Sequence, residues 1–269
     1  PCDVFNWNSK IQAQSMTMLL YLINNAKYKG QRIEKIDLHG TKMNDEAFAK
    51  FFAGLNPLHY KLLDISNNEL RNNSIDSMIE FLAKDGAYVE TLQLQKTRSS
   101  PTAYQLFFIF LSENLDKSPK SIAFRVESPK SREETSVIDF ATEIGDFLGK
   151  DPCLEELRFG GQITGKDAIG VISQLKTNHH LRHLEMQSDI FERYTSADPE
   201  LDETLKLIFN DFVEILHDVL TNEETRCILE DLNFPLLTEL FIAYIPNLTI
   251  WPTIVRQLET NYNTNNHIG

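Results

Sequence analysis

The stretch GGQITGKD, residues 160–167, is the segment whose residue types come nearest to a phosphate-binding motif. Gly160, Gly165 and Lys166 fit the spacing G-x-x-x-x-G-K, in which backbone N–H groups and a lysine hold phosphates, between a predicted strand and a predicted helix. However, Asp167 stands where a Ser or Thr would bind magnesium, and its carboxylate would repel the phosphates. Nucleotide binding is therefore only a remote alternative, because an ordinary strand-to-helix turn explains the segment better.

A second candidate for chemistry is a group of three histidines, which could bind zinc if their side chains converged. His179 and His180 fall in a predicted turn, whereas His183 alternates with apolar residues as in a strand. No fourth ligand recurs at metal-site spacing, so we expect solvated or capping roles and no metal. The sequence also lacks a G-x-S-x-G nucleophile motif, and Cys153 has no basic setting. We therefore expect no catalytic residue, no cofactor and no enzymatic activity.

Composition narrows the class of partner. The 269 residues are 42% apolar and 24% charged, which is typical of a soluble globular protein. The formal net charge of −13 would repel phosphate backbones and anionic lipids, so we expect no nucleic acid partner and no binding to membrane surfaces. The longest apolar run, residues 103–111, is about half the length of a bilayer-crossing helix, so we expect no membrane insertion.

The cysteines and the start of the chain bear on location. Cys2, Cys153 and Cys227 are an odd number at unpatterned spacing, which favours a reducing compartment over a disulfide framework. No basic-then-apolar signal stands at the front of the chain. We therefore expect a cytoplasmic protein, or a secreted effector delivered into a host cytosol, that is monomeric in isolation.

The elements that would position all these residues follow a repeat, which is clearest between residues 60 and 70. Tyr60, Leu63, Ile65, Asn68 and Leu70 fill the pattern L-x-x-L-x-L-x-x-N-x-L with an aromatic residue at its first position. Between copies, apolar residues recur with helical spacing, so each repeat is predicted to be a strand followed by a helix. Further copies, at a period of about 28 residues with one double-length gap at the end, are centred on Ile36, Leu92, Phe124, Leu157, Leu184 and Leu240.

The repeats predict a single domain with distinct ends. Helix starts are predicted at Asn44, at Ser74 and at Ser100 followed by Pro101, because these residues are typical of helix N-termini. The stretch 201–222 is predicted to be one long helix, since its apolar residues keep helical spacing throughout. The predicted parts of the domain are an N-terminal helical cap at 1–29, regular repeats at 30–190, an enlarged degenerate repeat at 191–250, and a closing helix and tail at 251–269.

This pattern resembles the leucine-rich repeat superfamily, in the long cytoplasmic branch typified by ribonuclease inhibitor, over roughly residues 30–250. The resemblance implies an α/β fold: a right-handed horseshoe solenoid with a concave parallel sheet and convex helices. It also implies that Asn68 turns inward and bonds backbone groups of the turn, each of which would cost about 1–3 kcal/mol if buried without a partner. Thr41, Thr97 and Asp189 take the equivalent places in other repeats.

Residues between the apolar positions of a strand must point to the opposite face of the sheet. This face is acidic at one end, basic in the middle and mixed towards the other end, so it could align a partner of alternating charge. A sheet face that is merely solvated is the plainer alternative. We expect a non-enzymatic scaffold, adaptor or effector that binds a protein partner, of an identity the sequence does not give, through the concave face and rim. The central column of candidate binding residues is Asp37, Asp64, Gln93, Arg125, Arg158, Glu185 and Phe241.

Arg98 is a further candidate, because it follows the third predicted strand, at the rim of the horseshoe. In architecture the chain is also similar to the Ran GTPase-activating proteins, which present an arginine from a rim loop, and to actin-regulating horseshoes of the CARMIL and tropomodulin type. No local motif of these families matches. A GTPase-activating or actin-regulatory function, with Arg98 acting in trans in the former case, is therefore the alternative to a binding module.

Overall fold

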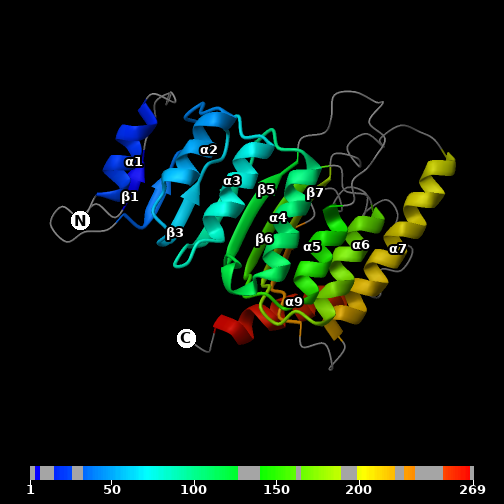
Figure 1. Ribbon diagram of the computed structural model, residues 1–269. Coiled ribbons are helices and arrows are strands. Elements are labelled where there is room, and N and C mark those ends of the chain that lie inside the picture. The colour runs from blue at the N-terminus through cyan, green and yellow to red at the C-terminus, as the bar shows by residue number, and fades with distance from the viewer. Residues whose placement is uncertain are drawn as a thin grey trace. The chain divides into compact units, whose positions relative to one another are not determined.

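The predicted alternation of strands and helices forms a repeat-like α/β fold with parallel strands (Figure 1). The computed structural model describes residues 4–6, 15–25, 33–126, 140–161, 165–188, 199–221, 227–233 and 251–266. The chain consists of two compact units, Pro1–Glu127 and Ser128–Gly269.

In the first unit, successive strands lie side by side in chain order and all described pairs are parallel. The strands are β1 (Val4–Asn6), β2 (Lys35–Asp37), β3 (His59–Asp64), β4 (Tyr88–Leu94) and β5 (Ser121–Arg125). Ile36 pairs with Leu63, and Leu63 pairs with Leu92, as the period of the repeat predicted. The strand β1 was not predicted from the sequence, which indicated only a helix before residue 30.

The helices of the first unit pack against one another in the same order and cover one face of its strands (Figure 1). They are α1 (Met16–Asn24), α2 (Asp45–Gly54), α3 (Asn72–Leu82), α4 (Pro101–Glu113) and the 3₁₀ turn η3 (Leu115–Lys117). Asn44 and Ser100 cap α2 and α4 as predicted, by accepting the N–H groups of Ala47 and Ala103. Ser74, predicted to precede its helix, lies instead in the first turn of α3.

Phenylalanines fill the space between the helices and the strands of the first unit. The Phe52 ring lies 6.1 Å from that of Phe81 on the next helix, and the Phe108 ring lies 5.4 Å from that of Phe124 on β5. All four side chains are buried. Burial of one such ring contributes about 1.5–3 kcal/mol. These contacts therefore hold together neighbouring coils, where a coil is one strand with the helix that follows it.

The second unit repeats the arrangement. Its strands β6 (Glu156–Gly161), β7 (His183–Ser188) and β8 (Asp231–Asn233) are parallel, and Leu157 pairs with Leu184 as predicted. The predicted long helix is confirmed as α7 (Pro199–Thr221). The other helical elements are α5 (Phe140–Gly149), α6 (Gly165–Ser173), the 3₁₀ turn η4 (Gln174–Lys176) and α9 (Trp251–Asn266).

The double-length gap after Leu184 left room for a further repeat, and the strand next to β7 lies within that gap. In β8, Leu232 pairs with Leu184, whereas the sequence placed the next repeat around Leu240. The signal was missed because β8 is only three residues long and offers a single apolar position. The copy around Leu240, together with Phe241 and Asp189, lies outside the described residues.

The turns after β2, β3 and β4 explain the paired asparagines of residues 67 and 68. Asn67 has a positive φ of 57°, a conformation that asparagine tolerates better than most residues, and Gly40 and Lys96 have positive φ at the same place in the neighbouring turns. Asn68, only 5% exposed, accepts the Met43 N–H at 3.1 Å through its side chain. Its amide also donates to the backbone oxygens of Leu38, Ile65 and Ser66 at 2.8, 3.0 and 3.1 Å.

Long side chains join the C-terminal ends of helices to the coil that precedes them. Lys84, just after α3, donates to the Ala53 oxygen of α2 at 3.3 Å. Lys117 donates in turn to the oxygens of Lys84 and Ala87 at 3.1 and 3.2 Å. The Lys84 oxygen also accepts the Ala87 N–H within its own turn at 3.2 Å. Carbonyls near a helix end lack the usual N–H partner further along the helix, so the two lysines add hydrogen bonds between successive coils.

Candidate interaction surfaces

The open sheet face of the first unit, defined here by Asp37, Asp64 and Gln93, is turned away from its helices. Strand pairing places these three residues in one row across β2, β3 and β4, and each is partly exposed. Backbone N–H groups hold both carboxylates, since Asp37 accepts that of His39 at 3.0 Å and Asp64 that of Ser66 at 2.9 Å. The predicted acidic end of the column is therefore present as a fixed row.

Arg125 does not continue this row. The pairing of β4 with β5 sets Gln93 beside Ala123, which is buried, and Leu94 beside Phe124. The sequence aligned Phe124 with Leu92, two residues out of register, because Ile122, Phe124 and Val126 alternate and either of the first two could be taken as the central apolar position. Arg125 is partly exposed at the end of β5, two residues beyond the row.

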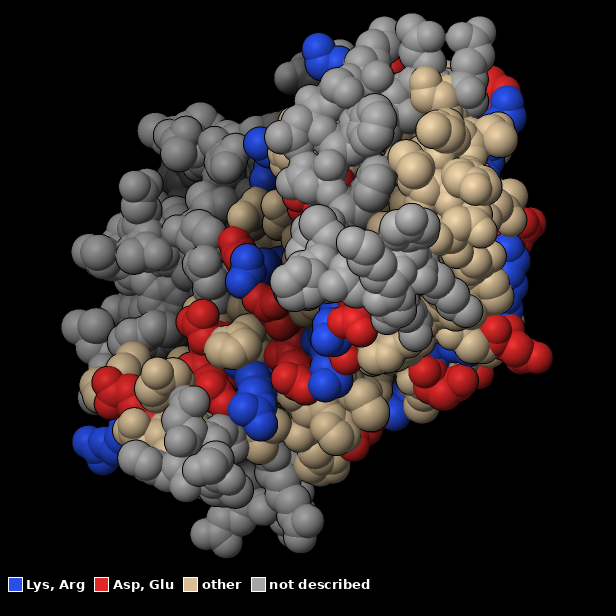
Figure 2. Space-filling view, turned by 90° about the vertical axis from the view of Figure 1, so that its left-hand side faces the viewer, with Lys and Arg blue, Asp and Glu red and all other residues tan. Residues whose placement is uncertain are grey.

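Other charges of the first unit's strands form pairs with one another. Lys61 lies 2.5 Å from Glu34, and His59 lies 3.2 Å from Glu90, between the closest nitrogen and oxygen atoms. The His59 ring also contacts that of Tyr88 edge-on, with centroids 5.0 Å apart. Figure 2 shows one face of the molecule, on which Lys and Arg side chains lie among Asp and Glu side chains.

In the second unit, Arg158 and Glu185 are neighbours across β6 and β7, in the row that the sequence predicted. Arg158 pairs with Glu156 on its own strand and lies 3.7 Å from Glu185. Gln187 donates to the other oxygen of Glu185 at 2.7 Å. The basic residue of this face is therefore neutralised by its neighbours, which weakens its role as an independent anchor.

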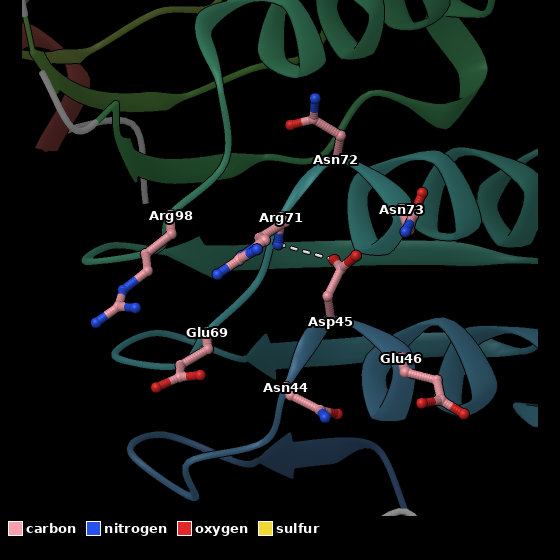
Figure 3. Close-up of a pocket in the computed structure, with 8 residues that line it drawn as sticks. All are labelled: Asn44, Asp45, Glu46, Glu69, Arg71, Asn72, Asn73 and Arg98. Atoms are coloured by element: carbon pink, nitrogen blue, oxygen red, sulfur yellow. Dashed lines mark hydrogen bonds between the residues drawn. The ribbon is translucent and has the colours of Figure 1, made fainter. Parts of the chain in front are cut away.

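A pocket that the sequence did not predict lies in the first unit, where the loops after β2, β3 and β4 lead into the next helices. This rim pocket is an open depression of about 600 Å³. Arg98, predicted to lie at the rim, is one of its walls, and Arg71 from the preceding coil stands beside it (Figure 3). The lining residues are Asn44, Asp45, Glu46, Glu69, Arg71, Asn72, Asn73 and Arg98.

Asp45 shapes the floor of the rim pocket by capping a helix that is not its own. Its Oδ1 atom accepts the N–H groups of Arg71 and Ser74 at 2.8 and 2.9 Å, and the Ser74 hydroxyl at 2.6 Å. In the next coil, Asn72 accepts the Ser100 N–H at 3.2 Å. The available sequence signal was a polar residue at one helix start whose side chain also accepts N–H groups at the start of the next helix. It was missed because a capping residue is normally sought only next to the helix that it caps.

The candidate phosphate loop is not assembled as a phosphate site in its described part. Gly160 belongs to β6 and pairs with Gln187, so its backbone is part of the sheet. Gly165 begins α6, Asp167 is in the first turn of that helix, and residues 162–164 lie outside the described part. An aspartate at this position opposes an anion at the helix start.

The three histidines have separate surroundings. The His179 ring lies 2.9 Å from the Asp151 carboxylate, and the backbone N–H of His179 donates to the same carboxylate at 2.6 Å. His180 is 4.0 Å from Asp151, whereas His183 lies on β7 beside Glu156. The residues that the structure describes contain no cluster of three or more side chains suited to a metal ion.

Comparison with known proteins adds no identification, since no protein-family model and no curated protein matches the chain. Among the helices within the described ranges, none combines the length and the apolar character needed to cross a bilayer.

Proposed function

We propose that this chain is a non-enzymatic interaction module of the leucine-rich repeat type, which binds a protein partner in the cytosol through its open sheet face and the rim beside it. The observation that carries the proposal is the row of Asp37, Asp64 and Gln93. These side chains are partly exposed, lie on strands in register, and have carboxylates held by backbone N–H groups. Preorganised charges of this kind favour association with a complementary surface.

The inward-turned Asn68, the positive φ before it and the paired Leu63 and Leu92 support the leucine-rich repeat assignment. GTPase activation by Arg98 has weaker support. The rim pocket around Arg98 also contains Asp45, Glu46 and Glu69, and these three carboxylates would oppose the approach of a nucleoside triphosphate. A binding module is therefore the function that the geometry favours.

The proposal is tested with an isosteric double variant, Asp37→Asn with Asp64→Asn, which keeps the oxygen that accepts each backbone N–H but removes both charges. A partner is first captured from lysate with the unaltered protein, and its affinity for each purified variant is then measured by calorimetry. We expect an affinity loss of about tenfold or more for the double variant. Asp76→Asn with Glu80→Gln, at two exposed positions of α3, removes the same number of charges, is the matched control and should bind as the unaltered protein does. Equal affinity for all three proteins would refute a role for the open sheet face.

A further inference from the structure

The rim pocket differs from the sheet faces in how its charges are satisfied. Asp45 accepts N–H groups at the start of α3 through its side chain, and Glu46 forms an ion pair with Lys50 at 2.7 Å. By contrast, the guanidinium groups of Arg71 and Arg98 make no ion pair with any residue that the structure describes. Both side chains are exposed, and Figure 3 shows them side by side, pointing in the same direction out of the pocket.

We propose that the rim pocket binds an acidic peptide segment of the protein partner, with one carboxylate held between Arg71 and Arg98. Guanidinium groups bind carboxylates through two parallel N–H bonds, and two such groups from adjacent coils can share one acidic side chain or hold two consecutive ones. This inference rests on the proposed function, because it assumes a protein ligand, and it adds the chemistry of one contact.

The remaining lining explains why a peptide fits better than a more highly charged anion. Glu69 stands beside the two arginines (Figure 3) and can accept a backbone N–H of the peptide. Asn72 and Asn73 can both donate and accept. The same Glu69, with Asp45 and Glu46, would repel a phosphate dianion or a nucleic acid backbone. The volume of about 600 Å³ is within the usual range for ligand sites, of about 300–1,000 Å³.

Cations on the described strands of each unit are already paired, which supports the choice of the rim pocket. Lys61 in the first unit pairs with Glu34, and Arg158 in the second unit pairs with Glu156, so an incoming carboxylate would have to displace an internal partner. At the rim pocket the arginines exchange only water for the ligand. This difference lowers the desolvation and rearrangement that binding requires.

The test uses a blocked peptide with a single carboxylate, Ac-Gly-Gly-Glu-Gly-Gly-NH₂, and its neutral counterpart with Gln in place of Glu. Binding is followed by the NMR signals of the Arg71 and Arg98 side-chain N–H groups, at low and at high salt. We expect the acidic peptide alone to shift both signals, with an affinity that falls as salt increases. Arg71→Gln and Arg98→Gln should each weaken binding about tenfold, and Arg98→Lys should weaken it less.

Arg256→Gln, which changes the net charge equally at an exposed position of α9, is the matched control and should bind within about twofold of the unaltered protein. Any of three results would overturn the inference: no peptide binding, equal binding of the neutral peptide, or equal shifts on adding sulfate alone. The Asp37→Asn, Asp64→Asn variant is included in the same titration and should bind the peptide normally. If the peptide fails while that variant still loses the protein partner, only this inference is wrong; the reverse result refutes only the role of the open sheet face.

Discussion

Replacing Asn68 by alanine removes five hydrogen bonds from one buried turn. The Asn68 oxygen accepts from the Met43 N–H and from the Thr41 hydroxyl, each at 3.1 Å, and its amide donates to three backbone oxygens. Two of those oxygens keep another partner, because Thr41 donates to Leu38 and the Gly40 N–H donates to Ser66. The groups that lose their described partner are therefore the Met43 N–H and the Ile65 oxygen.

The size of the effect follows from these two groups. A buried donor or acceptor without a partner costs about 1–3 kcal/mol, so Asn68→Ala should lower the free energy of unfolding by about 2–6 kcal/mol. Asn68→Thr should lose roughly half as much, because a hydroxyl can still accept from Met43 but can donate only one bond. Thr41 and Thr97 show that threonine is tolerated at the equivalent turns.

Urea unfolding followed by circular dichroism measures the free energy, and hydrogen exchange at the Met43 amide reports on the turn itself. Asn73→Ala, at an exposed position of the same coil, is the control and should change the free energy by no more than about 0.5 kcal/mol. If Asn68→Ala behaves like this control and the Met43 amide exchanges no faster, then the asparagine does not support the coil.

Two further predictions concern titratable groups. Burial raises the pKa of Tyr104 to about 12, although its hydroxyl lies 2.7 Å from that of Thr97. The folded protein should therefore lose stability as the pH rises from the tyrosine's ordinary pKa of about 10 towards 12, and the late absorbance titration should vanish in Tyr104→Phe. Partial burial opposes ionisation of Asp151, but the N–H and ring of His179 outweigh it and lower the carboxyl pKa. The ionised Asp151 carboxylate should stabilise the fold above its unfolded pKa, and this stabilisation should disappear as the pH falls through the lower folded pKa. Acid unfolding of Asp151→Asn, compared with that of the unaltered protein, tests this. Identical loss of stability at low pH in the two proteins would contradict it.

The period of the repeat was enough to predict much of the architecture. Leucines at regular spacing placed Leu63 beside Leu92 and Leu157 beside Leu184, because apolar residues at a fixed interval must stack to be buried. The register failed at β5, where Ala123 rather than Arg125 stands beside Gln93. There Ile122, Phe124 and Val126 form one alternating series, which fits the repeat pattern in two registers that differ by two residues.

The candidate site was predicted less completely than the fold. Arg98 was expected at the rim and lines a pocket there, but Arg71 was not singled out. Arg71 precedes a helix start, where sequence reasoning looks for a capping side chain, and the cap comes instead from Asp45 in the preceding coil. Contacts between residues one repeat apart depend on exact register, which the spacing of apolar residues determines only within a few positions.

The bonds from Asp45 to α3, and from Lys84 and Lys117 to the helix ends before them, have a mechanical consequence. An unfolding machine that pulled on one end of the first unit would break these cross-coil bonds one set at a time. The unit would then yield in a series of small force steps, each of which releases about one coil of the chain, and would present no single large barrier.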